Sequence, residues 1–338
     1  MNSTNNLYKT SKEVIENFNC IGCGACINIC PYRKLNKNNA VRIFNCNNSG
    51  GKCDLVCPKT IADTKSLTKN TSPENQTSYM GNVLKIYKSK SGKRFENLFS
   101  AKKTITALNC FILKSKVSKK ILMTKTKKDL SPFPFFAESE EEIINFSKTN
   151  YCSSSPLGLV NLSKEKNYSF TGLPCQILSL AKFETLDKNF QKPFLPEIKI
   201  SLFCTWSLNP EKYSNYLKKN FKNKEIKSCF INPSNKNKIF FELNDNSTAE
   251  LNIDEIRKFI RKGCASCTDL TGKYSDISVG DCETDKNFNT LIIRTQKGRE
   301  LVNNAVKNNY LEISDYPENT KTMLEKAAQN KSKTPSAF

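Results

Sequence analysis

The N-terminal run of cysteines constrains this chain more than any other feature of its sequence. Four cysteines stand at gaps of two, two and three residues, and a proline follows the last of them: Cys20, Cys23, Cys26, Cys30 and Pro31. This C-x2-C-x2-C-x3-C-P spacing is typical of a segment that wraps a 4Fe-4S cluster. Gly22 and Gly24 would let the backbone approach the inorganic sulfides closely. We therefore predict a small ferredoxin-like iron–sulfur domain.

A second set of cysteines repeats only part of this spacing, and Ser49 stands where a two-cluster ferredoxin would place another cysteine. In such ferredoxins the last cysteine of each run serves the other cluster. The first cluster, called site 1, would then have four thiolate ligands: Cys20, Cys23, Cys26 and Cys57. The second, called site 2, would have three thiolates and one candidate oxygen ligand: Cys30, Cys46, Cys53 and Ser49.

Because site 2 is one thiolate short, three outcomes stay open at this point. It could hold a 3Fe-4S cluster, a 4Fe-4S cluster with an oxygen ligand such as Ser49, or no cluster at all. We expect a second cluster of altered type.

The composition excludes several kinds of chemistry. The 338 residues include 15 cysteines and no histidine, which rules out Ser-His and Cys-His nucleophiles, histidine bases, and histidine-ligated zinc or haem. The net charge of +21 would suit an anionic cofactor or an acidic partner, and compositional bias towards lysine would produce it as well. No nucleic-acid-binding motif accompanies the charge, so we do not expect a nucleic-acid partner.

Neither export nor a membrane span is indicated by the sequence. The N-terminus lacks the basic, apolar and small-residue pattern of a signal peptide. No window approaches the roughly 18 consecutive apolar residues of a membrane-spanning helix. Thiols that bind metal also suit a reducing compartment. We expect a cytoplasmic protein, and peripheral attachment to a membrane complex stays open.

Composition and periodicity divide the chain into four parts. We predict the ferredoxin-like domain over residues 1–63, a polar linker over 64–82, a larger α/β domain over 83–316 with halves at 83–165 and 166–316, and a helical and flexible tail over 317–338. In the larger domain, strands are expected near residues 83–89, 120–123, 168–170, 197–203, 238–242 and 291–294. Helices are expected near residues 105–113, 138–147, 176–183, 210–219, 254–259 and 298–308. Strands that alternate with helices favour an α/β core, so the whole chain reads as α+β or α/β.

Four further cysteines lie at the ends of expected elements in the larger domain. Cys175 follows a strand and a Gly-x-Pro turn, Cys204 ends a strand, and a C-x2-C loop carries the remaining two. Such positions could assemble one four-thiolate site, called site 3, from distant segments: Cys175, Cys204, Cys264 and Cys267. A third iron–sulfur cluster or a zinc ion would both suit four thiolates. Of the other cysteines, Cys110 is expected to be a buried small hydrophobe, and three have no partner at metal spacing: Cys152, Cys229 and Cys282.

The motifs around these cysteines resemble a known family. They are TGLPCQ at residues 171–176, LFC at 202–204, RKGCASCTD at 261–269, SDISVGD at 275–281 and IIRT at 292–295, preceded by YKS at 87–89 and SSP at 154–156. Their order over residues 83–312 resembles the family of beta subunits of the coenzyme F420 hydrogenases and dehydrogenases, in which a ferredoxin-type front end also occurs. Relatives in that family reduce other partners, including a chlorophyll intermediate, so the resemblance does not fix the substrate.

The resemblance implies an FAD beside an iron–sulfur cluster, with coenzyme F420, a soluble deazaflavin, as the hydride partner and with redox subunits of a hydrogenase, dehydrogenase or reductase as partners. It implies these flavin-site candidates: Lys102, Lys103, Thr104, Ser154, Ser155, Thr171, Gly172, Pro174, Gln176, Asp281 and Arg294. Thr104, Thr171 and Gln176 are candidate hydrogen-bonding groups, and Asp281 is a candidate ribose or ring contact. Arg294 could neutralise the charge of the reduced flavin, or it could be a surface arginine at a strand end.

One motif departs from the family pattern. Where the family has a Ser-Gly-Gly turn before a helix, this chain has SAKKT at residues 100–104. Lysines cannot give the close backbone approach of glycines, although they can pair with phosphates. Lys102 and Lys103 could therefore contact an FAD pyrophosphate or a substrate anion, could simply face solvent, or could mark a chain that has lost its flavin.

Two functions follow from these expectations. In the first, the chain is an oxidoreductase in which FAD exchanges hydride with F420 and two or three 4Fe-4S clusters, one of which could be a 3Fe-4S cluster, pass on single electrons. No side chain is assigned a catalytic role, because cofactors carry such chemistry. In the second, the chain is a non-catalytic iron–sulfur electron-transfer subunit with lost or altered flavin binding. A zinc-stabilised nucleic-acid binder is a third and weaker alternative.

Overall fold

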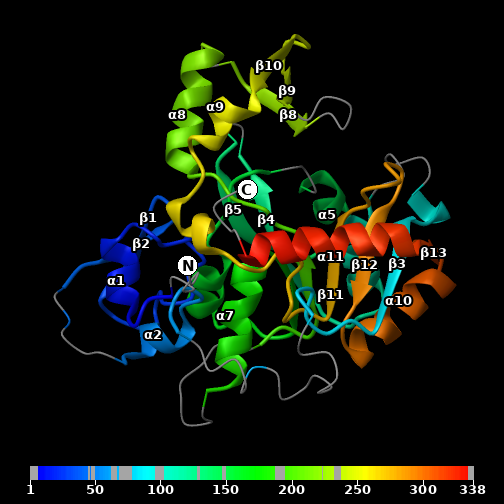
Figure 1. Ribbon diagram of the computed structural model, residues 1–338, viewed down its shortest axis with the longest axis horizontal. Coiled ribbons are helices and arrows are strands. Elements are labelled where there is room, and N and C mark those ends of the chain that lie inside the picture. The colour runs from blue at the N-terminus through cyan, green and yellow to red at the C-terminus, as the bar shows by residue number, and fades with distance from the viewer. Residues whose placement is uncertain are drawn as a thin grey trace.

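The fold was analysed in a computed structural model that describes residues 7–44, 46, 50–61, 67, 78–95, 103–127, 130–146, 150–186, 195–222, 224–231 and 237–333. Two candidate ligands, Ser49 and Lys102, and most of the expected linker at 64–82 lie outside these residues. The expected fold class is confirmed: a small N-terminal unit precedes a large mixed α/β unit (Figure 1).

The N-terminal unit is built from short elements. They are α1 (Ser11–Glu16), β1 (Arg33–Asn36), β2 (Asn39–Arg42) and α2 (Lys52–Val56). Thr10 caps α1 by accepting a hydrogen bond from the Glu13 backbone N–H at 3.2 Å. The strands β1 and β2 pair antiparallel through a two-residue turn in which Lys37 and Asn38 both have positive φ, as tight hairpin turns require. Little regular structure is present, so the cysteine loops fill most of this unit.

An eight-stranded sheet forms the centre of the large unit, with strand order β13-β3-β12-β11-β7-β6-β4-β5. Its strands are β3 (Lys85–Ser91), β4 (Lys120–Thr126), β5 (Pro132–Ala137), β6 (Tyr168–Gly172), β7 (Lys199–Leu202), β11 (Ile277–Asp281), β12 (Asn289–Ile293) and β13 (Leu311–Asp315). Four of them, β4, β6, β7 and β11, run parallel side by side. Their carboxyl ends therefore meet at one edge, which is where open α/β sheets bind ligands.

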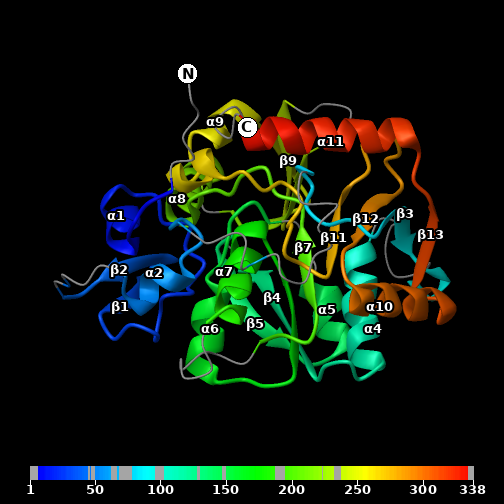
Figure 2. The ribbon, with the colours of Figure 1, turned by 60° about the horizontal axis from the view of Figure 1, so that its bottom comes forward.

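Helices cover both faces of this sheet (Figures 1 and 2). One face packs against α4 (Thr104–Lys114), α5 (Glu140–Phe146) and α10 (Gln296–Lys307). The other packs against α6 (Pro156–Ser163), α7 (Pro174–Glu184) and α11 (Glu318–Lys333). In β4, Ile121 and Met123 face the first layer, whereas Leu122 between them faces the second. This alternation is what a strand buried on both faces requires.

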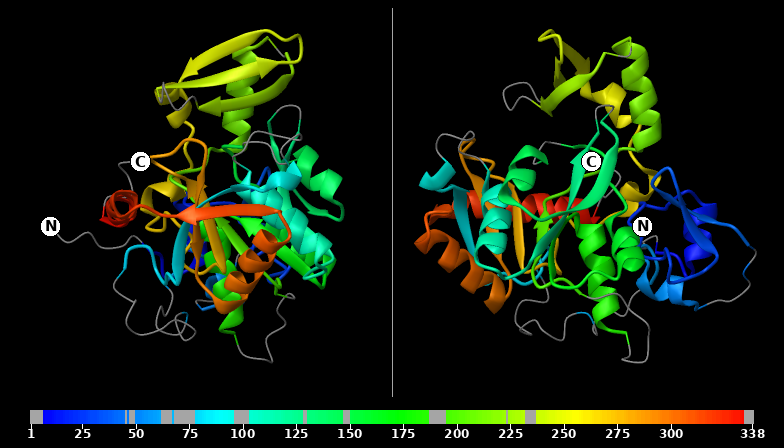
Figure 3. Two further views of the ribbon diagram at one scale, coloured as in Figure 1. Left: turned by 90° about the vertical axis from the view of Figure 1, so that its right-hand side faces the viewer. Right: turned by 180° about the vertical axis from the view of Figure 1, so that it is seen from behind.

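A small subdomain stands apart from the sheet, between Cys204 and Cys264 (Figure 3). It contains α8 (Pro210–Asn220), β8 (Ile226–Ile231), β9 (Lys238–Leu243), β10 (Thr248–Asn252) and α9 (Ile253–Arg257). Its three strands form their own antiparallel sheet, and Tyr213, Phe241 and Ile256 contribute to a separate core. Two 3-10 turns complete the described elements: η2 (Lys93–Phe95) and η3 (Lys262–Ser266).

Most expected helices and strands of the large unit are confirmed, including a helix in the C-terminal segment, α11. The strands β5, β8, β10, β11 and β13 and the helix α6 were not foreseen. Strand β5 contains Pro132 and Pro134, which signal against a central strand, and it lies at the sheet edge, where missing N–H groups are tolerated. None of the helices in the described part of the chain has the length and apolar character needed to cross a membrane.

The N-terminal unit docks on α6 through its cysteine loop. Ser155 donates a hydrogen bond to the carbonyl oxygen of Gly22 at 2.6 Å, and Asn161 donates to the carbonyls of Ala25 and Ile27 at 2.9 and 2.7 Å. At Gly24, where φ is +82°, an added Cβ would lie 2.5 Å from the backbone nitrogen of Gly158. The two backbones therefore touch directly at this junction.

We expect Gly24→Ala to destabilise the protein more than Gly50→Ala does. Both glycines have φ near +80°, which costs an alanine about 1–2 kcal/mol. A Cβ at Gly50 meets no atom within 4 Å, whereas a Cβ at Gly24 would overlap the Gly158 backbone, adding about 1–3 kcal/mol. Anaerobic thermal unfolding should show a clearly lower midpoint for Gly24→Ala. Equal midpoints for the two variants would contradict the close contact at this junction.

Candidate iron–sulfur and cofactor sites

The structure brings the four cysteines expected at site 1 into one buried region. Burial raises the pKa of the Cys23 thiol to about 11 and that of Cys57 to about 12. Burial and then the neighbouring Cys23, Cys57 and Cys20 raise the pKa of the Cys26 thiol. Thiols raise one another's pKa only when they lie close together. The donor set of site 1 therefore fits a cluster that binds four thiolates.

A buried lysine from α7 adjoins site 1. Lys182 is 3% exposed, and its Nζ donates to the Cys57 carbonyl, to the Thr60 carbonyl at 3.1 Å and to Thr60 Oγ1 at 3.0 Å. Burial lowers the pKa of this ammonium, whereas the thiols of Cys57 and Cys23 raise it. Lys182 thus places a fixed positive charge beside site 1 and holds the chain that carries Cys57.

The four cysteines expected at site 3 also converge. Cys175 lies in the first turn of α7, Cys204 follows β7, and η3 carries Cys264 with Cys267 directly after it. Burial and then the thiols of Cys267, Cys204 and Cys264 raise the pKa of Cys175. Burial and then the thiols of Cys264 and Cys267 raise the pKa of Cys204. The donor set of site 3 therefore fits a four-thiolate group as well.

Helix α11 supplies site 3 with its own cation. Lys331 is 1% exposed, and its Nζ donates to the carbonyl oxygen of Thr205. Its charge lowers the pKa of Cys204 and of Cys264, against the larger effect of burial. The C-terminal helix α11, which lies along the top of Figure 2, therefore brings Lys331 to site 3.

Helix α7 connects sites 1 and 3. Cys175 begins the helix, Ser179 one turn later lies 3.7 Å from Cys23 Sγ, and Lys182 reaches Cys57. Seven residues of helix rise by about 10 Å, so the two sites are close neighbours. The thiol of Cys23 also raises the pKa of Cys175, in agreement with these contacts along α7.

A buried arginine lies where the two sets meet. Arg261 is 4% exposed and donates to Asn39 Oδ1 at 2.6 Å and to the Asn38 carbonyl at 3.2 Å. Burial lowers its pKa, and the thiols of Cys20, in site 1, and of Cys264, in site 3, are the largest opposing influences. One guanidinium therefore acts on both sites.

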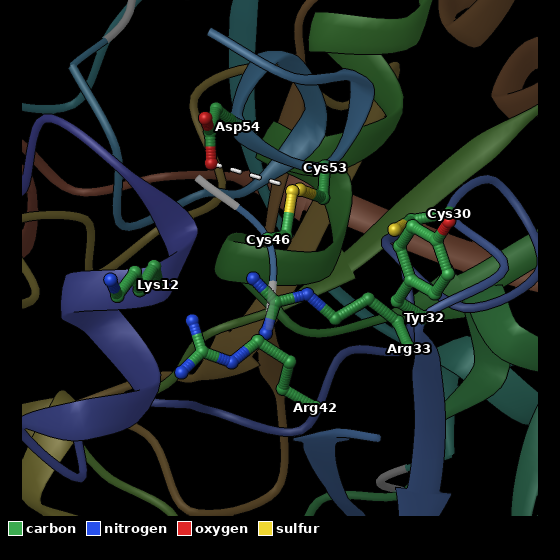
Figure 4. Close-up of a pocket in the computed structure, with 8 residues that line it drawn as sticks. All are labelled: Lys12, Cys30, Tyr32, Arg33, Arg42, Cys46, Cys53 and Asp54. Atoms are coloured by element: carbon green, nitrogen blue, oxygen red, sulfur yellow. Dashed lines mark hydrogen bonds between the residues drawn. The ribbon is translucent and has the colours of Figure 1, made fainter. Parts of the chain in front are cut away.

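The three cysteines expected at site 2 line a small cavity. Figure 4 shows its lining, in which three cysteines face basic and polar side chains: Cys30, Cys46, Cys53, Lys12, Tyr32, Arg33, Arg42 and Asp54. The three thiols expected at site 2 are therefore brought together, and the expected oxygen ligand, Ser49, lies outside the described residues. Burial raises the pKa of Cys53, and Arg33 opposes that increase.

Within the described residues, no three cysteine, aspartate or glutamate side chains lie close enough to share one metal ion. A cluster instead distributes its thiolates over several irons.

The cysteines outside the three sites are all buried: Cys110, Cys152, Cys229 and Cys282. Burial raises the pKa of the first three to about 12. The expectation that Cys110 is a buried small residue within a helix is confirmed.

Several flavin-site candidates meet at the carboxyl edge of the sheet. Thr104, at the start of α4, pairs its hydroxyl with that of Ser89 at 3.0 Å, and its N–H donates to Asn289 Oδ1 at 3.4 Å. Thr171, near the end of β6, donates to Asn109 Oδ1 at 2.9 Å. These contacts bring the start of α4 to the edge where β3 ends and β12 begins.

A second group of candidates surrounds Cys175. Gln176 accepts a hydrogen bond from the Leu173 N–H at 2.9 Å and donates to the Ser154 carbonyl at 3.2 Å, while the hydroxyl of Ser154 pairs with Thr124 at 2.6 Å. Pro174 opens α7 at a position where its missing N–H costs nothing. Gly172 leaves no room for a Cβ, which would lie 2.2 Å from the Phe170 ring. The hydroxyl of Ser155 already donates to the Gly22 carbonyl oxygen, the contact described above between the N-terminal unit and α6.

Arg294 is buried, and its guanidinium donates all its hydrogen bonds to other groups of the protein. It is 2% exposed, so the alternative of a surface arginine is wrong. Its Nε donates to Ser278 Oγ at 2.7 Å, Nη1 to the Met80 and Asn82 carbonyls at 2.7 Å each, and Nη2 to Thr271. These bonds occupy the five N–H groups of the guanidinium. Arg294 therefore ties distant segments together and has no donor left for a flavin.

Lys103 and Asp281 lie near the same edge. Lys103 precedes α4, and burial lowers the pKa of its ammonium. Asp281 is the last residue of β11 and pairs in register with Asn289. Both therefore stay candidates for contact with a ligand at the carboxyl edge.

Sequence reasoning did not single out the buried cations near the cysteine sites, among them Arg33, Lys182, Arg261 and Lys331. With 53 basic residues in the chain, nothing in composition separates these from surface residues. Only Arg261 carried a signal, because it stands three residues before Cys264 in the quoted motif.

The fold and its cysteine sites define an iron–sulfur protein with a ferredoxin-type unit docked on a larger α/β unit. Comparison with known proteins supports both the iron–sulfur unit and the larger α/β unit. Residues 165–319 match the family described as the C terminus of the coenzyme F420 hydrogenase/dehydrogenase beta subunit, and residues 13–33 match the 4Fe-4S binding domain. The chain thus contains a domain of the coenzyme F420 hydrogenase/dehydrogenase beta subunit family, preceded by an N-terminal 4Fe-4S binding domain.

Individual proteins show the same likeness. An uncharacterized protein of Methanocaldococcus jannaschii is 27% identical, over 90% of this chain and 91% of its own length. One of the subunits of the F(420)H(2) dehydrogenase of Methanosarcina mazei is 22% identical, over 85% of this chain and 82% of its own. A chain of the F420-reducing [NiFe] hydrogenase complex from Methanosarcina barkeri shares the fold, with a TM-score of 0.66, 20% identity, and coverage of 79% of this chain and 93% of that chain.

We expect Cys175→Ala to remove one cluster and Cys229→Ala to remove none. Cys175 lies among four thiols, whereas Cys229 lies in the separate core of the small subdomain. After anaerobic purification, Cys175→Ala should lose up to about four irons and four sulfides per chain, with lower absorbance near roughly 400 nm. Loss of one zinc ion with unchanged iron would show instead that site 3 is a zinc site.

Proposed function

We propose that this chain is a flavin- and iron–sulfur-containing oxidoreductase subunit that exchanges hydride with coenzyme F420 and passes single electrons to a partner redox subunit. One observation carries the proposal: Cys175 lies in both groups at once. It is a member of site 3, and the flavin candidates Gly172, Pro174 and Gln176 flank it in sequence. A flavin at the carboxyl edge would therefore adjoin the first of two neighbouring cluster sites.

The donors at the carboxyl edge fit an FAD in charge and in place. Helix α4 has no side-chain cap from Lys103, and although the Thr104 N–H donates to Asn289 Oδ1, the positive end of the helix dipole would favour a phosphate there. Lys103 adds an ammonium directly before that helix, and Lys102 would add another. When bound, FAD would supply the ability to take an electron pair from a hydride donor and release single electrons.

The chain's own residues would orient the cofactor and connect it to the clusters. Gln176 fixes the Ser154 loop against the start of α7, so cofactor contacts in that loop would be held at a set distance from Cys175. Helix α7 then links site 3 to site 1. The net charge of +21 would attract the phosphate and carboxylates of a deazaflavin.

A specific observation also favours the second function, a non-catalytic electron-transfer subunit. The side chains of Thr104, Thr171 and Gln176 already hydrogen-bond to protein groups, and Arg294 has no donor left. A chain that kept its clusters but bound no flavin would use these contacts only to hold the fold. The two functions differ in flavin content and in turnover.

We expect the anaerobically purified chain to contain about one FAD and to reduce a viologen dye with reduced F420 as donor. Lys103→Gln should lower flavin content because it removes the ammonium beside the start of α4. Lys114→Gln, on the exposed last turn of the same helix, is the matched control and should leave flavin unchanged. Acid release measures the flavin content of each variant, and steady-state reduction of the dye measures its turnover. Iron-containing but flavin-free and inactive protein, even after reconstitution, would favour the electron-transfer subunit.

We expect Arg261→Gln to lower the reduction potentials of the clusters at sites 1 and 3 together. Each cluster becomes more negative on reduction, so removal of a nearby positive charge disfavours the reduced form. If the reduced cluster loses about 1–2 kcal/mol of electrostatic stabilisation, its one-electron reduction potential falls by about 40–90 mV. Arg257→Gln, on the exposed surface of α9, should change neither potential. Redox titration followed by EPR checks this, and an unchanged pair of potentials would contradict the position assigned to Arg261.

A further inference from the structure

The cavity at site 2 combines three thiols with unusual positive charge. Lys12, Arg33 and Arg42 line it together with Cys30, Cys46 and Cys53 (Figure 4). Arg42 also pairs with Glu16 at 3.3 Å, and Lys12 lies on the exposed side of α1. A site that needs only three thiolates would not need this many cations unless a further negative charge enters it.

Among the described residues, the one acidic side chain that lines this cavity is Asp54, and it already has hydrogen-bond partners, one of which is the Cys53 thiol at 3.8 Å (Figure 4). Asp54 Oδ1 accepts a hydrogen bond from the Ser11 N–H at 2.6 Å. Its Oδ2 accepts from the N–H groups of Gly50 and Gly51 at 3.0 and 3.1 Å, which caps α2. Both oxygens therefore hold the backbone of the N-terminal unit. Ligation of iron by Asp54 would break these bonds, so Asp54 is not the fourth ligand.

Arg33 lines the cavity, and one of its guanidinium nitrogens makes no hydrogen bond to the described residues. It is 4% exposed, and its Nη2 donates to Ser11 Oγ at 3.0 Å. Its charge lowers the pKa of the Cys53 thiol, against the larger effect of burial, which raises it. Its buried Nη1 has no hydrogen-bond partner among the described residues. In Figure 4 the guanidinium extends into the middle of the cavity, below Cys46 and beside Arg42. A buried guanidinium nitrogen without a partner is costly unless an acceptor binds to it.

We propose that site 2 holds a 4Fe-4S cluster with three cysteine ligands, and that its fourth iron binds a small exogenous anion that Arg33 Nη1 holds. The inference rests on the proposed iron–sulfur function. Three thiolates bind three irons and leave the fourth without a thiolate. Guanidinium donors and small anions make strong, charge-assisted hydrogen bonds. The basic lining would compensate the charge of both the cluster and its added ligand.

The test uses the full-length protein, purified anaerobically, with ¹³C-cyanide as the probe anion. EPR and ENDOR of the reduced protein should show a ¹³C hyperfine coupling on one cluster, and its signal should shift as cyanide is titrated. Arg33→Gln should weaken cyanide binding at least ten-fold, and Arg33→Lys should restore part of the affinity. Lys12→Gln is the matched control, because that lysine lines the same cavity from the exposed side of α1, and it should change the affinity less than three-fold.

Three results would overturn the inference. The first is a site 2 cluster that stays in the 3Fe-4S form when ferrous iron is added. The second is a wild-type protein without ¹³C coupling, or an Arg33→Gln variant with unchanged cyanide affinity. The third concerns Ser49: if Ser49→Ala creates a cyanide site that the wild type lacks, the serine is the fourth ligand. Under our proposal, Ser49→Ala leaves cyanide binding unchanged.

Iron counting separates this inference from the proposed function. About eight irons per chain, with cluster signals lost in Cys57→Ala and Cys175→Ala but not in Cys53→Ala, would show that site 2 is empty of iron and overturn the inference alone. Absence of iron from sites 1 and 3 would instead overturn the proposed electron-transfer function.

Discussion

Helix α7 is the element on which the arrangement of the cysteine sites depends. Its first turn carries Cys175, its middle places Ser179 against Cys23, and its buried Lys182 holds the chain at Cys57. Pro174 and Gln176 fix where the helix begins, because one supplies a ready-made φ and the other caps the Leu173 N–H. Sites 1 and 3 thus keep a set separation through one rigid helix rather than through two flexible loops.

Buried positive charge is the second general feature of these sites. Thiolates and the clusters that they bind are anionic, and removing them from water is costly unless opposite charge accompanies them. Each site has its own cation from a different part of the chain: Lys182 at site 1, Arg33 at site 2 and Lys331 at site 3, with Arg261 shared between sites 1 and 3. Such cations stabilise the reduced state of a cluster, so their placement would set the order in which the clusters accept electrons.

The sequence predicted which cysteines lie together better than it predicted the details of the fold. The ligand exchange of two-cluster ferredoxins predicted that Cys57 would lie with the first three cysteines, and the structure places Cys57 close to Cys23 and Cys26. Site 3 could be foreseen because Cys175 and Cys204 both follow strands whose carboxyl ends meet at one sheet edge. The antiparallel edge strand β5 was not foreseen, because Pro132 and Pro134 weaken its strand signal and only the partner strand β4 makes it regular.

The buried cations and the role of Arg294 could not be predicted for a different reason. Burial of a lysine or arginine depends on long-range packing, such as α11 bringing Lys331 to Thr205, 126 positions away in the chain. Arg294 was expected either at a flavin or on the surface, whereas five hydrogen bonds place it inside the fold. Local patterns contain no information about such contacts.

The most direct test of the account is the magnetic interaction between the clusters at sites 1 and 3. We predict that EPR of the fully reduced protein shows spin–spin coupling between two 4Fe-4S clusters, and that Cys175→Ala and Cys57→Ala each leave a simpler, uncoupled signal. Two independent signals in the wild-type protein, unaffected by loss of the other cluster, would contradict the central claim that α7 joins two neighbouring clusters into one electron path.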